Sequence, residues 1–285
     1  MTDQVLLDLV DVFGAAPLRG NPLAVVRGAE GWSGERMLRL TQWLGFSETT
    51  FLLPPRDPAA DYRVRIFYPG GELPFAGHPT LGTCHAWLQA GGQPRREGVM
   101  VQECGAGLVE VRQEGEMLSF CAPPLVKSGE LSDEERAEAA RIAGVDEGAI
   151  LSAVHADNGP GWKMLRLRSA EDVLAASPLP RAEPGTDLGL AGPYPDASEV
   201  AWEIRAFFVN DKGSLVEDPV TGSFNAAAAM YLFGTGLAKE SYVAAQGRKL
   251  GADGRVFCCV DKNNAVWVGG RVVTISSGGV MPSFD

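Results

Sequence analysis

Short apolar runs separated by Gly, Pro and Asp dominate the hydrophobic pattern of the chain. Runs of this kind, rich in branched and aromatic residues and bounded by turn residues, are typical of β-strands. The predicted strands are LLDLVDVFG, PLAVV, TTFLLP, YRVRIFY, LVEVRQ and MLSFCA in the first half and MLRLR, AWEIRAFFV, RVFCCV and AVWVGGRVVTI in the second. The pattern therefore predicts a protein rich in β-structure.

Helical patterns are fewer. Ser33 can cap a segment whose apolar residues recur three and four positions apart and which Gly45 ends. The sequence S-D-E-E that starts at Ser132 is a capping box, and it predicts a mostly charged helix that runs to Gly144. Residues 178–198 are rich in Pro, Gly and Asp, and we expect them to form a long surface connection.

A weak internal repeat relates the two halves of the chain. Residues 72–91 align with residues 217–236 without a gap, and the upstream segments VRIF and IRAF are also similar. The identical positions are Glu72 and Glu217, Pro74 and Pro219, Gly77 and Gly222, and Gly91 and Gly236. Because these identities fall on turn and boundary residues, the repeat predicts two similar lobes, each with one strand–turn–helix unit.

Each copy of the repeat ends a strand, turns at a glycine and starts a helix rich in small residues, which lets the helix lie close to surrounding strands. The first turn of such a helix presents unpaired N–H groups that favour an anion such as a carboxylate. Two facing helix starts, at Gly77 and Gly222, would make an anion-binding cleft. The alternative is that both glycines only permit tight turns.

Polar side chains lie next to both glycines. His78 follows Gly77, where the helix dipole disfavours a protonated imidazole and a neutral ring could accept a proton. Helix capping or packing is its alternative role. Asp218 and Ser223 lie on either side of the second turn, and Asp218 could instead satisfy backbone N–H groups of that turn.

Glu48 lies in the segment F-S-E-T-T-F-L-L, which has the composition of a strand. Period-two alternation would place its side chain on the same face as Thr50 and Leu52. If that face points inward, burial should raise the pKa of Glu48 towards neutrality, where proton transfer at carbon works best. If it points outward, Glu48 is an ordinary surface acid.

Composition and charge exclude several classes of function. The 25 basic and 36 acidic residues give a net charge of -11, which would attract neither nucleic acid nor an anionic membrane surface. No apolar run approaches the roughly 20 residues that span a bilayer, and the first residues do not form a basic leader. We therefore expect a soluble, cytoplasmic protein with no nucleic-acid or membrane partner.

Cofactor motifs are also absent. The 5 cysteines contain no C-x-x-C pair and there are 3 histidines, so neither a zinc site nor a disulfide framework is indicated. The sequence lacks the nucleotide-binding patterns G-x-G-x-x-G and G-x-x-x-x-G-K-[ST] and the nucleophile elbow G-x-S-x-G. We predict no metal and no cofactor.

Four segments together resemble a known family. They are G-N-P-L-A-V-V (Gly20–Val26), S-E-T-T-F (Ser47–Phe51), G-H-P-T-L-G (Gly77–Gly82) and E-D-P-V-T-G-S (Glu217–Ser223). In this order and spacing they resemble the PhzF-like phenazine biosynthesis family over nearly the whole chain.

The resemblance implies an α+β fold similar to that of diaminopimelate epimerase. In that fold two pseudo-symmetric lobes each roll a barrel-like sheet around a central helix. Here the lobes would be residues 1–118 and 119–273, with a C-terminal strand at 274–285 returning to the first lobe. The active site would lie in the cleft between the lobes.

The resemblance also assigns roles to individual residues. Glu48 would be the proton-transferring acid/base, with His78 and Asp218 as assisting catalytic groups. The implied substrate-binding residues are Asn21, Gly77, Gly222 and Ser223.

The family's best-known activity moves a hydrogen within the ring of trans-2,3-dihydro-3-hydroxyanthranilate without metal or organic cofactor. The resemblance therefore implies a cofactor-independent isomerase that acts on a small carboxylate, and homodimers are typical of the family. An amino-acid epimerase or racemase and a non-catalytic carboxylate-binding protein are the alternatives.

Epimerases of this fold place a cysteine at each helix start, whereas Cys84 lies nearly two turns into its helix. Phe224 and Asn225 depart from the family pattern and leave the substrate open.

Overall fold

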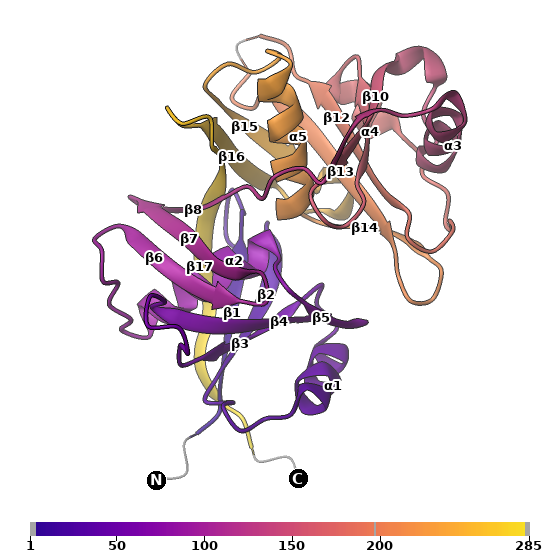
Figure 1. Ribbon diagram of the computed structural model, residues 1–285. Coiled ribbons are helices and arrows are strands. Elements are labelled where there is room, and N and C mark those ends of the chain that lie inside the picture. The colour runs from indigo at the N-terminus through magenta and orange to yellow at the C-terminus, as the bar shows by residue number, and fades with distance from the viewer. Residues whose placement is uncertain (1–3, 197, 283–285) are drawn as a thin grey trace. The chain divides into compact units, whose positions relative to one another are not determined.

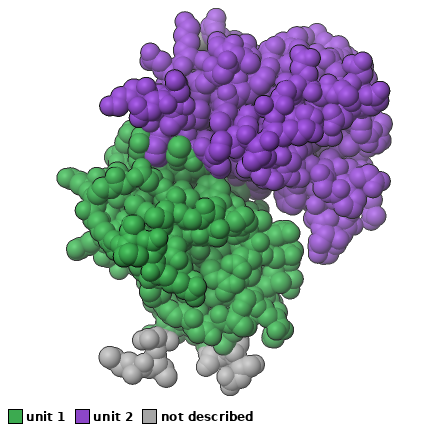
Figure 2. Space-filling model, viewed as in Figure 1, with its two compact units in different colours: residues 1–121, 269–285 green, residues 122–268 purple. Residues whose placement is uncertain are grey.

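The computed structural model describes residues 4–196 and 198–282 and has an α+β architecture (Figure 1). It divides into two compact units (Figure 2): unit 1 is formed by residues 1–121 with 269–285, and unit 2 by residues 122–268. The chain thus leaves unit 1 after residue 121 and returns at 269, where the sequence predicted 118 and 274. Of the predicted returning strand, residues 283–285 lie outside the described residues.

The described residues of unit 1 form strands and two helices. Its elements are β1 (Leu6–Val12), β2 (Asn21–Arg27), α1 (Gly34–Leu44), β3 (Thr49–Leu53), β4 (Tyr62–Tyr68), β5 (Gly71–Leu73), α2 (Gly77–Gln89), β6 (Val99–Cys104), β7 (Gly107–Glu114), β8 (Met117–Cys121) and most of β17 (Val266–Val280). Among the described residues, eight strands close into a barrel in the order β1, β2, β3, β4, β6, β7, β8 and β17, and β17 pairs back to β1. The parallel pairs β2–β3 and β4–β6 have α1 and α2 as their crossovers.

The barrel encloses α2, which packs against β1, β2, β3, β4, β6, β7 and β8 (Figure 1). Small residues make this enclosure feasible. A Cβ atom at Gly82 would lie 2.5 Å from Leu23 Cδ2 and within 3.1 Å of methyl groups of Val10 and Val12. Because no side chain fits there, a glycine is needed where the helix meets β1 and β2.

The outer face of unit 1 carries α1, as predicted from its capping residues. The Ser33 hydroxyl accepts the Arg36 N–H, and Gly45 ends the helix with a φ of 73°. Met37 on the inner side of α1 packs with Phe51 and Phe67 of the sheet. The barrel wall is therefore covered on both faces at β3, and all five residues of that strand are buried.

Unit 2 repeats this arrangement. Its elements are β9 (Lys127–Glu130), α3 (Asp133–Ala143), a 3₁₀ turn (Glu147–Ala149), β10 (Ile150–Asp157), β11 (Lys163–Leu167), α4 (Ala170–Ala175), β12 (Asp187–Pro193), β13 (Trp202–Val209), β14 (Leu215–Glu217), α5 (Gly222–Gly234), β15 (Ser241–Gln246), a 3₁₀ turn (Arg248–Leu250), β16 (Gly254–Val260) and the first residues of β17. The pairs β10–β11, β12–β13 and β15–β16 are antiparallel, whereas β11–β12 and β13–β15 are parallel. This order matches β1 to β7, with α4 and α5 in the places of α1 and α2. The two-lobed fold class predicted from the sequence is confirmed.

The helix predicted after Ser132 is α3, with the capping box between Ser132 and Glu135 in place and Gly144 as its C-cap. Both α3 and α4 pack on one face of the unit 2 sheet, where Ile142 and Val173 join a core cluster. The opposite face of the sheet packs against α5, in which Phe224 and the run of alanines are buried.

The predicted surface connection at residues 178–198 is wrong in its central part. Residues 187–193 form β12, which lies between β11 and β13 and is buried from Leu188 to Gly192. Only glycine fits at position 189 of this strand, because Phe224 of α5 occupies the space that a Cβ atom would need. The glycines that suggested a loop are thus needed for close packing inside the unit.

We expect Gly189→Ala to destabilise unit 2. Its Cβ would lie 1.9 Å from Phe224 Cζ, and a buried ring can yield only by shifting its neighbours. Overpacking of this kind costs about 1–3 kcal/mol of unfolding free energy, which urea denaturation would measure. Gly234→Ala at the end of α5 is the control, because nothing lies within 4 Å of a Cβ there. Equal effects of both variants would contradict the packing argument.

Candidate active site

The start of α2 is buried and has no side-chain cap. Gly77 and His78 are the first residues of the helix, and Ala76 at the N-cap position contributes no side-chain hydrogen bond. Both residues lie inside unit 1. The first N–H groups of α2 therefore have no carbonyl partner within the helix and remain available to an anion.

Glu48 lies beside this helix start. Its Oε2 is 3.5 Å from His78 Nδ1, and the two side chains are 17% and 4% exposed. The segment around Glu48 is not wholly strand as predicted, because β3 begins only at Thr49. Two residues further on, Thr50 Oγ1 accepts a hydrogen bond of 2.8 Å from Thr83 of α2. This contact ties the beginning of β3 to α2, on the side where Glu48 meets His78.

Burial lowers the pKa of His78 from 6.5 to about 3, an effect that the backbone carbonyl of Pro22 partly opposes. The imidazole is therefore neutral at neutral pH, and the cause is burial and not the helix dipole from which a neutral ring was expected. The neighbouring Asn21, the first residue of β2, is fully buried. The structure thus brings Asn21–Pro22 and the Glu48–His78 pair together within unit 1.

Asp11 is a residue of this region that the sequence analysis missed. Its carboxylate accepts the backbone N–H groups of Gly20 (2.9 Å) and Arg19 (3.1 Å), so it holds the chain just before Asn21. Burial raises the pKa of Asp11, while these N–H bonds oppose the shift. A Cβ at Gly20 would lie 2.1 Å from the Val12 carbonyl oxygen. The only sequence signal was the presence of two acids, Asp8 and Asp11, inside an otherwise apolar strand.

A mostly apolar cavity of about 260 Å³ lies next to these residues. Its lining residues are Leu9, Val10, Asp11, Leu18, Gly20, Pro22, Leu23, Phe46 and Ile275. Pro22 and Phe46 connect it to the segments that carry Asn21 and Glu48. Unit 1 therefore combines a carboxyl group, a neutral imidazole and apolar space.

In unit 2 the start of α5 is held by a buried polar network. The Thr221 hydroxyl donates to Asp218 Oδ2 (2.7 Å), and Gln246 Nε2 donates to the Asp218 carbonyl (3.1 Å) and to Thr221 Oγ1 (2.8 Å). Asn225 Nδ2 donates to Gln246 Oε1 at 2.8 Å. Asn225 is therefore part of the support of the helix start. The sequence did not point to Thr221 or Gln246 as part of the site. Thr221 lies within the motif E-D-P-V-T-G-S but was given no role, and Gln246 comes from β15, remote in sequence from the helix start.

Ser223 is the second residue of α5 and is half-buried. Its hydroxyl accepts the indole N–H of Trp162, and its backbone carbonyl accepts the Asn158 amide. Gly222 precedes it and is buried, and α5 has no side-chain cap hydrogen bond. The start of α5 can therefore also present N–H groups and a hydroxyl to an anion.

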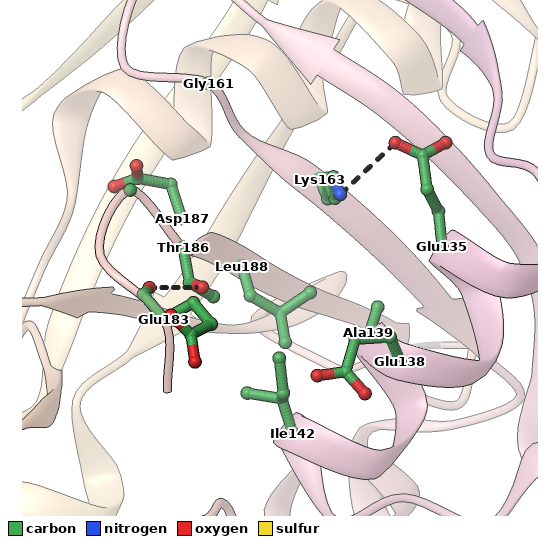
Figure 3. A pocket seen from close by; sticks show the side chains of 11 residues that line it. Glu135, Glu138, Ala139, Ile142, Gly161, Lys163, Glu183, Thr186, Asp187 and Leu188 are labelled. Atoms are coloured by element: carbon green, nitrogen blue, oxygen red, sulfur yellow. Dashed lines mark hydrogen bonds and ion pairs between the residues drawn. The ribbon is translucent and has the colours of Figure 1, made fainter. Parts of the chain in front are cut away.

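A second cavity, of about 230 Å³, lies in unit 2 away from these residues (Figure 3). Glu135 of α3 pairs there with Lys163 at 3.2 Å. Asp187 also lines it, and burial together with the charge of Asp157 raises the pKa of Asp187 to about 6. None of the predicted site residues lines this cavity, and its acidic lining is unfavourable for a carboxylate.

Comparison with known proteins agrees with these observations. Residues 10–278 match the sequence profile of the family described as phenazine biosynthesis-like protein (PhzC-PhzF). The chain belongs to this PhzF-like family. The match includes all four motifs from which the resemblance was inferred.

Three PhzF-like relatives illustrate the likeness. The chain is 29% identical over 279 residues to a trans-2,3-dihydro-3-hydroxyanthranilate isomerase of Pseudomonas chlororaphis, covering 96% of this chain and 98% of that protein. It is 33% identical over 290 residues to antisense-enhancing sequence 1 of Schizosaccharomyces pombe, covering 94% and 96%. The crystal structure of a Bacillus anthracis PhzF family protein matches with a TM-score of 0.82 at 22% identity, covering 98% of this chain and all of that one.

The cysteines do not take the positions that a two-thiol epimerase needs. Cys84 of α2 is buried, and burial raises the pKa of its thiol to about 12. The helix starts carry His78 and Ser223 instead.

Among the described residues, no group of three or more His, Cys, Asp and Glu side chains could hold a metal ion. No helix within the described ranges is long and apolar enough to cross a membrane.

The lowered pKa of His78 predicts a pH dependence of stability. The folded protein disfavours protonation of this ring, so its contribution is fully present above pH 6.5 and is lost as the pH falls from 6.5 towards 3. Between pH 7 and pH 5 this loss should be about 1–2 kcal/mol. In His78→Asn, the free energy of unfolding measured with urea should decrease less between pH 7 and pH 5 than it does in the parent protein. Parallel decreases in the variant and the parent would contradict the assignment of a buried neutral ring.

Proposed function

We propose that this PhzF-like isomerase moves a proton between two carbon atoms of a small carboxylate without a metal ion or an organic cofactor, with Glu48 as the acid/base. The observation that carries the proposal is the position of Glu48, mostly withdrawn from water and 3.5 Å from His78 at the start of α2. A general acid/base needs such a positioned carboxyl group where water does not compete for the proton.

The proposed reaction has two steps. The Glu48 carboxylate takes a proton from one carbon, the C–H electron pair moves into the substrate's conjugated system, and the carboxyl O–H forms. The same carboxyl then returns the proton to another carbon on the same face of the substrate. One group can serve both steps, because the acid formed in the first is the proton donor in the second.

His78 assists through its neutral ring. A neutral imidazole has one nitrogen that donates a hydrogen bond and one that accepts. We propose that it holds the Glu48 carboxyl group in place as the proton is taken up and released. A protonated ring would instead favour the ionised carboxylate and oppose the first step.

The unpaired N–H groups at the helix starts support binding of the substrate carboxylate. We assign this role to Gly77, Gly222 and Ser223, with Asn21 as a further substrate contact and Asp218 as an assisting polar group. That residues of both units serve one substrate, in a cleft between lobes, stays a prediction. Homodimerisation and a cytoplasmic location also stay predictions.

The relative from Pseudomonas chlororaphis is named for trans-2,3-dihydro-3-hydroxyanthranilate. We propose a ring carboxylate of this class as the first substrate to test. The apolar cavity beside Pro22 and Phe46 is consistent with a substrate that carries a hydrocarbon ring as well as a carboxylate. The chemistry of proton transfer does not require the same ring, so cyclic and acyclic carboxylates both belong in the screen.

We expect Glu48→Gln to abolish turnover. The amide is nearly isosteric but cannot cycle a proton, so the rate should fall by about 10²–10⁴-fold while folding and ligand binding are retained. The measurement is turnover of trans-2,3-dihydro-3-hydroxyanthranilate and deuterium incorporation from D₂O. Glu110→Gln is the matched control, because Glu110 is an exposed acid of unit 1 that pairs with Arg96.

The outcomes of this experiment separate the alternatives. Full activity of Glu48→Gln would overturn the assignment of the base. Label at the α-carbon of an amino acid, with inversion, would identify an epimerase. Binding without label in any carboxylate of the screen would favour a non-catalytic binding protein.

A further inference from the structure

The tip of the β10–β11 hairpin, residues 158–162, is tied to the first turn of α5 within unit 2. Asn158 Nδ2 donates to the Ser223 carbonyl oxygen at 2.9 Å. The indole N–H of Trp162 donates to Ser223 Oγ at 3.1 Å. Both ends of this short segment therefore contact the same residue at the helix start.

The hairpin tip is held by its own backbone. Asp157 Oδ1 accepts the N–H groups of Gly159 (2.7 Å) and Gly161 (2.8 Å), which have φ values of 138° and 106°. Glycine adopts such conformations without steric cost. The Ala156 N–H donates to the Trp162 carbonyl oxygen at 2.9 Å and closes the turn. Trp162 therefore leaves the turn at a defined position.

Packing fixes the orientation of the indole. Trp162 is 3% exposed, and its ring centroid lies 5.2 Å from that of Phe224. Phe224 is fully buried and fills the space beside Gly189. Because the two rings have little room to rotate, the direction of the indole N–H is set by the core of unit 2.

This N–H determines what the Ser223 hydroxyl can do. An indole nitrogen only donates, so Ser223 Oγ must accept from it and directs its own proton elsewhere. No described residue accepts a hydrogen bond from this hydroxyl. Its proton is therefore available beside the unpaired N–H groups of the first turn of α5, where an anion would be bound.

We propose that Trp162 is a positioning residue that orients the Ser223 hydroxyl as a hydrogen-bond donor to the substrate carboxylate, and that Asn158 holds the hairpin tip against α5. This inference rests on the proposed function, because it takes the carboxylate site to be at Ser223. Trp162 acts through Ser223 and not on the reacting carbon atoms.

The first test is Trp162→Phe, which keeps a ring against Phe224 and removes the N–H donor. The probe is 3-hydroxyanthranilate, an aromatic carboxylate that can bind but has no saturated ring carbon to deprotonate. We expect its Kd, and the KM of a turned-over substrate, to rise about three- to tenfold with kcat changed less than about twofold. Trp267→Phe is the matched control, because that indole donates to Asp261 at the β16–β17 turn. An unchanged Kd and KM in Trp162→Phe would overturn the inference.

A double-mutant cycle separates positioning from packing. In a Ser223→Ala background, Trp162→Phe should raise the Kd no further, since the hydroxyl that Trp162 orients is gone. The same rise in both backgrounds would mean that Trp162 acts through packing alone, which would overturn the proposed role.

A ligand-free measurement distinguishes failure of this inference from failure of the proposed function. The ¹H–¹⁵N resonance of the Trp162 indole, assigned by its loss in Trp162→Phe, should shift in Ser223→Ala because its acceptor is removed. An unshifted resonance would overturn the inference whether or not the protein is active. A shifted resonance in a protein that neither binds nor converts any carboxylate would reject the proposed function, and with it the role of the oriented hydroxyl in binding.

Discussion

Each unit is organised around the enclosure of one helix by a curled sheet, and this enclosure leaves almost no space. At Gly82 in unit 1 and Gly189 in unit 2, a single added carbon atom would overlap a neighbouring side chain. Protein interiors are packed to the density of organic crystals, so such contacts fix the depth and rotation of the helix. The position of each helix start, and of every group near it, follows from this packing.

The enclosure also sets the chemistry of the helix starts. Neither α2 nor α5 has a side-chain cap, so their first N–H groups stay available while the surrounding sheet excludes much of the water. The same exclusion keeps His78 neutral beside Glu48. Unpaired donors favour the binding of a carboxylate, and a carboxyl group beside a neutral imidazole, both shielded from water, favours transfer of a proton.

Support for these groups comes from segments remote in sequence. Asp11 holds the backbone before Asn21, Gln246 of β15 connects Asp218 to Asn225, and Trp162 contacts Ser223 from a hairpin tip. Gln246 and Trp162 make hydrogen bonds to a candidate site residue, and Asp11 bonds the backbone of Arg19 and Gly20 just before one. The proposed site therefore also depends on residues that position its side chains without contacting the substrate.

The sequence by itself determined the features that depend on neighbours along the chain. Capping residues predicted α1 and α3, and the repeated glycine turns predicted helices that begin at Gly77 and Gly222. Both predictions were possible because local backbone preferences and the repeat depend only on the order of residues. The glycines of residues 187–193 suggested a loop, whereas the fold uses Gly189 to admit Phe224. The pairing of Glu48 with His78, and the networks around Asp11 and Gln246, were decided only by the tertiary structure. The reason is physical: burial and hydrogen bonding depend on which distant segments pack together, and no local pattern carries that information.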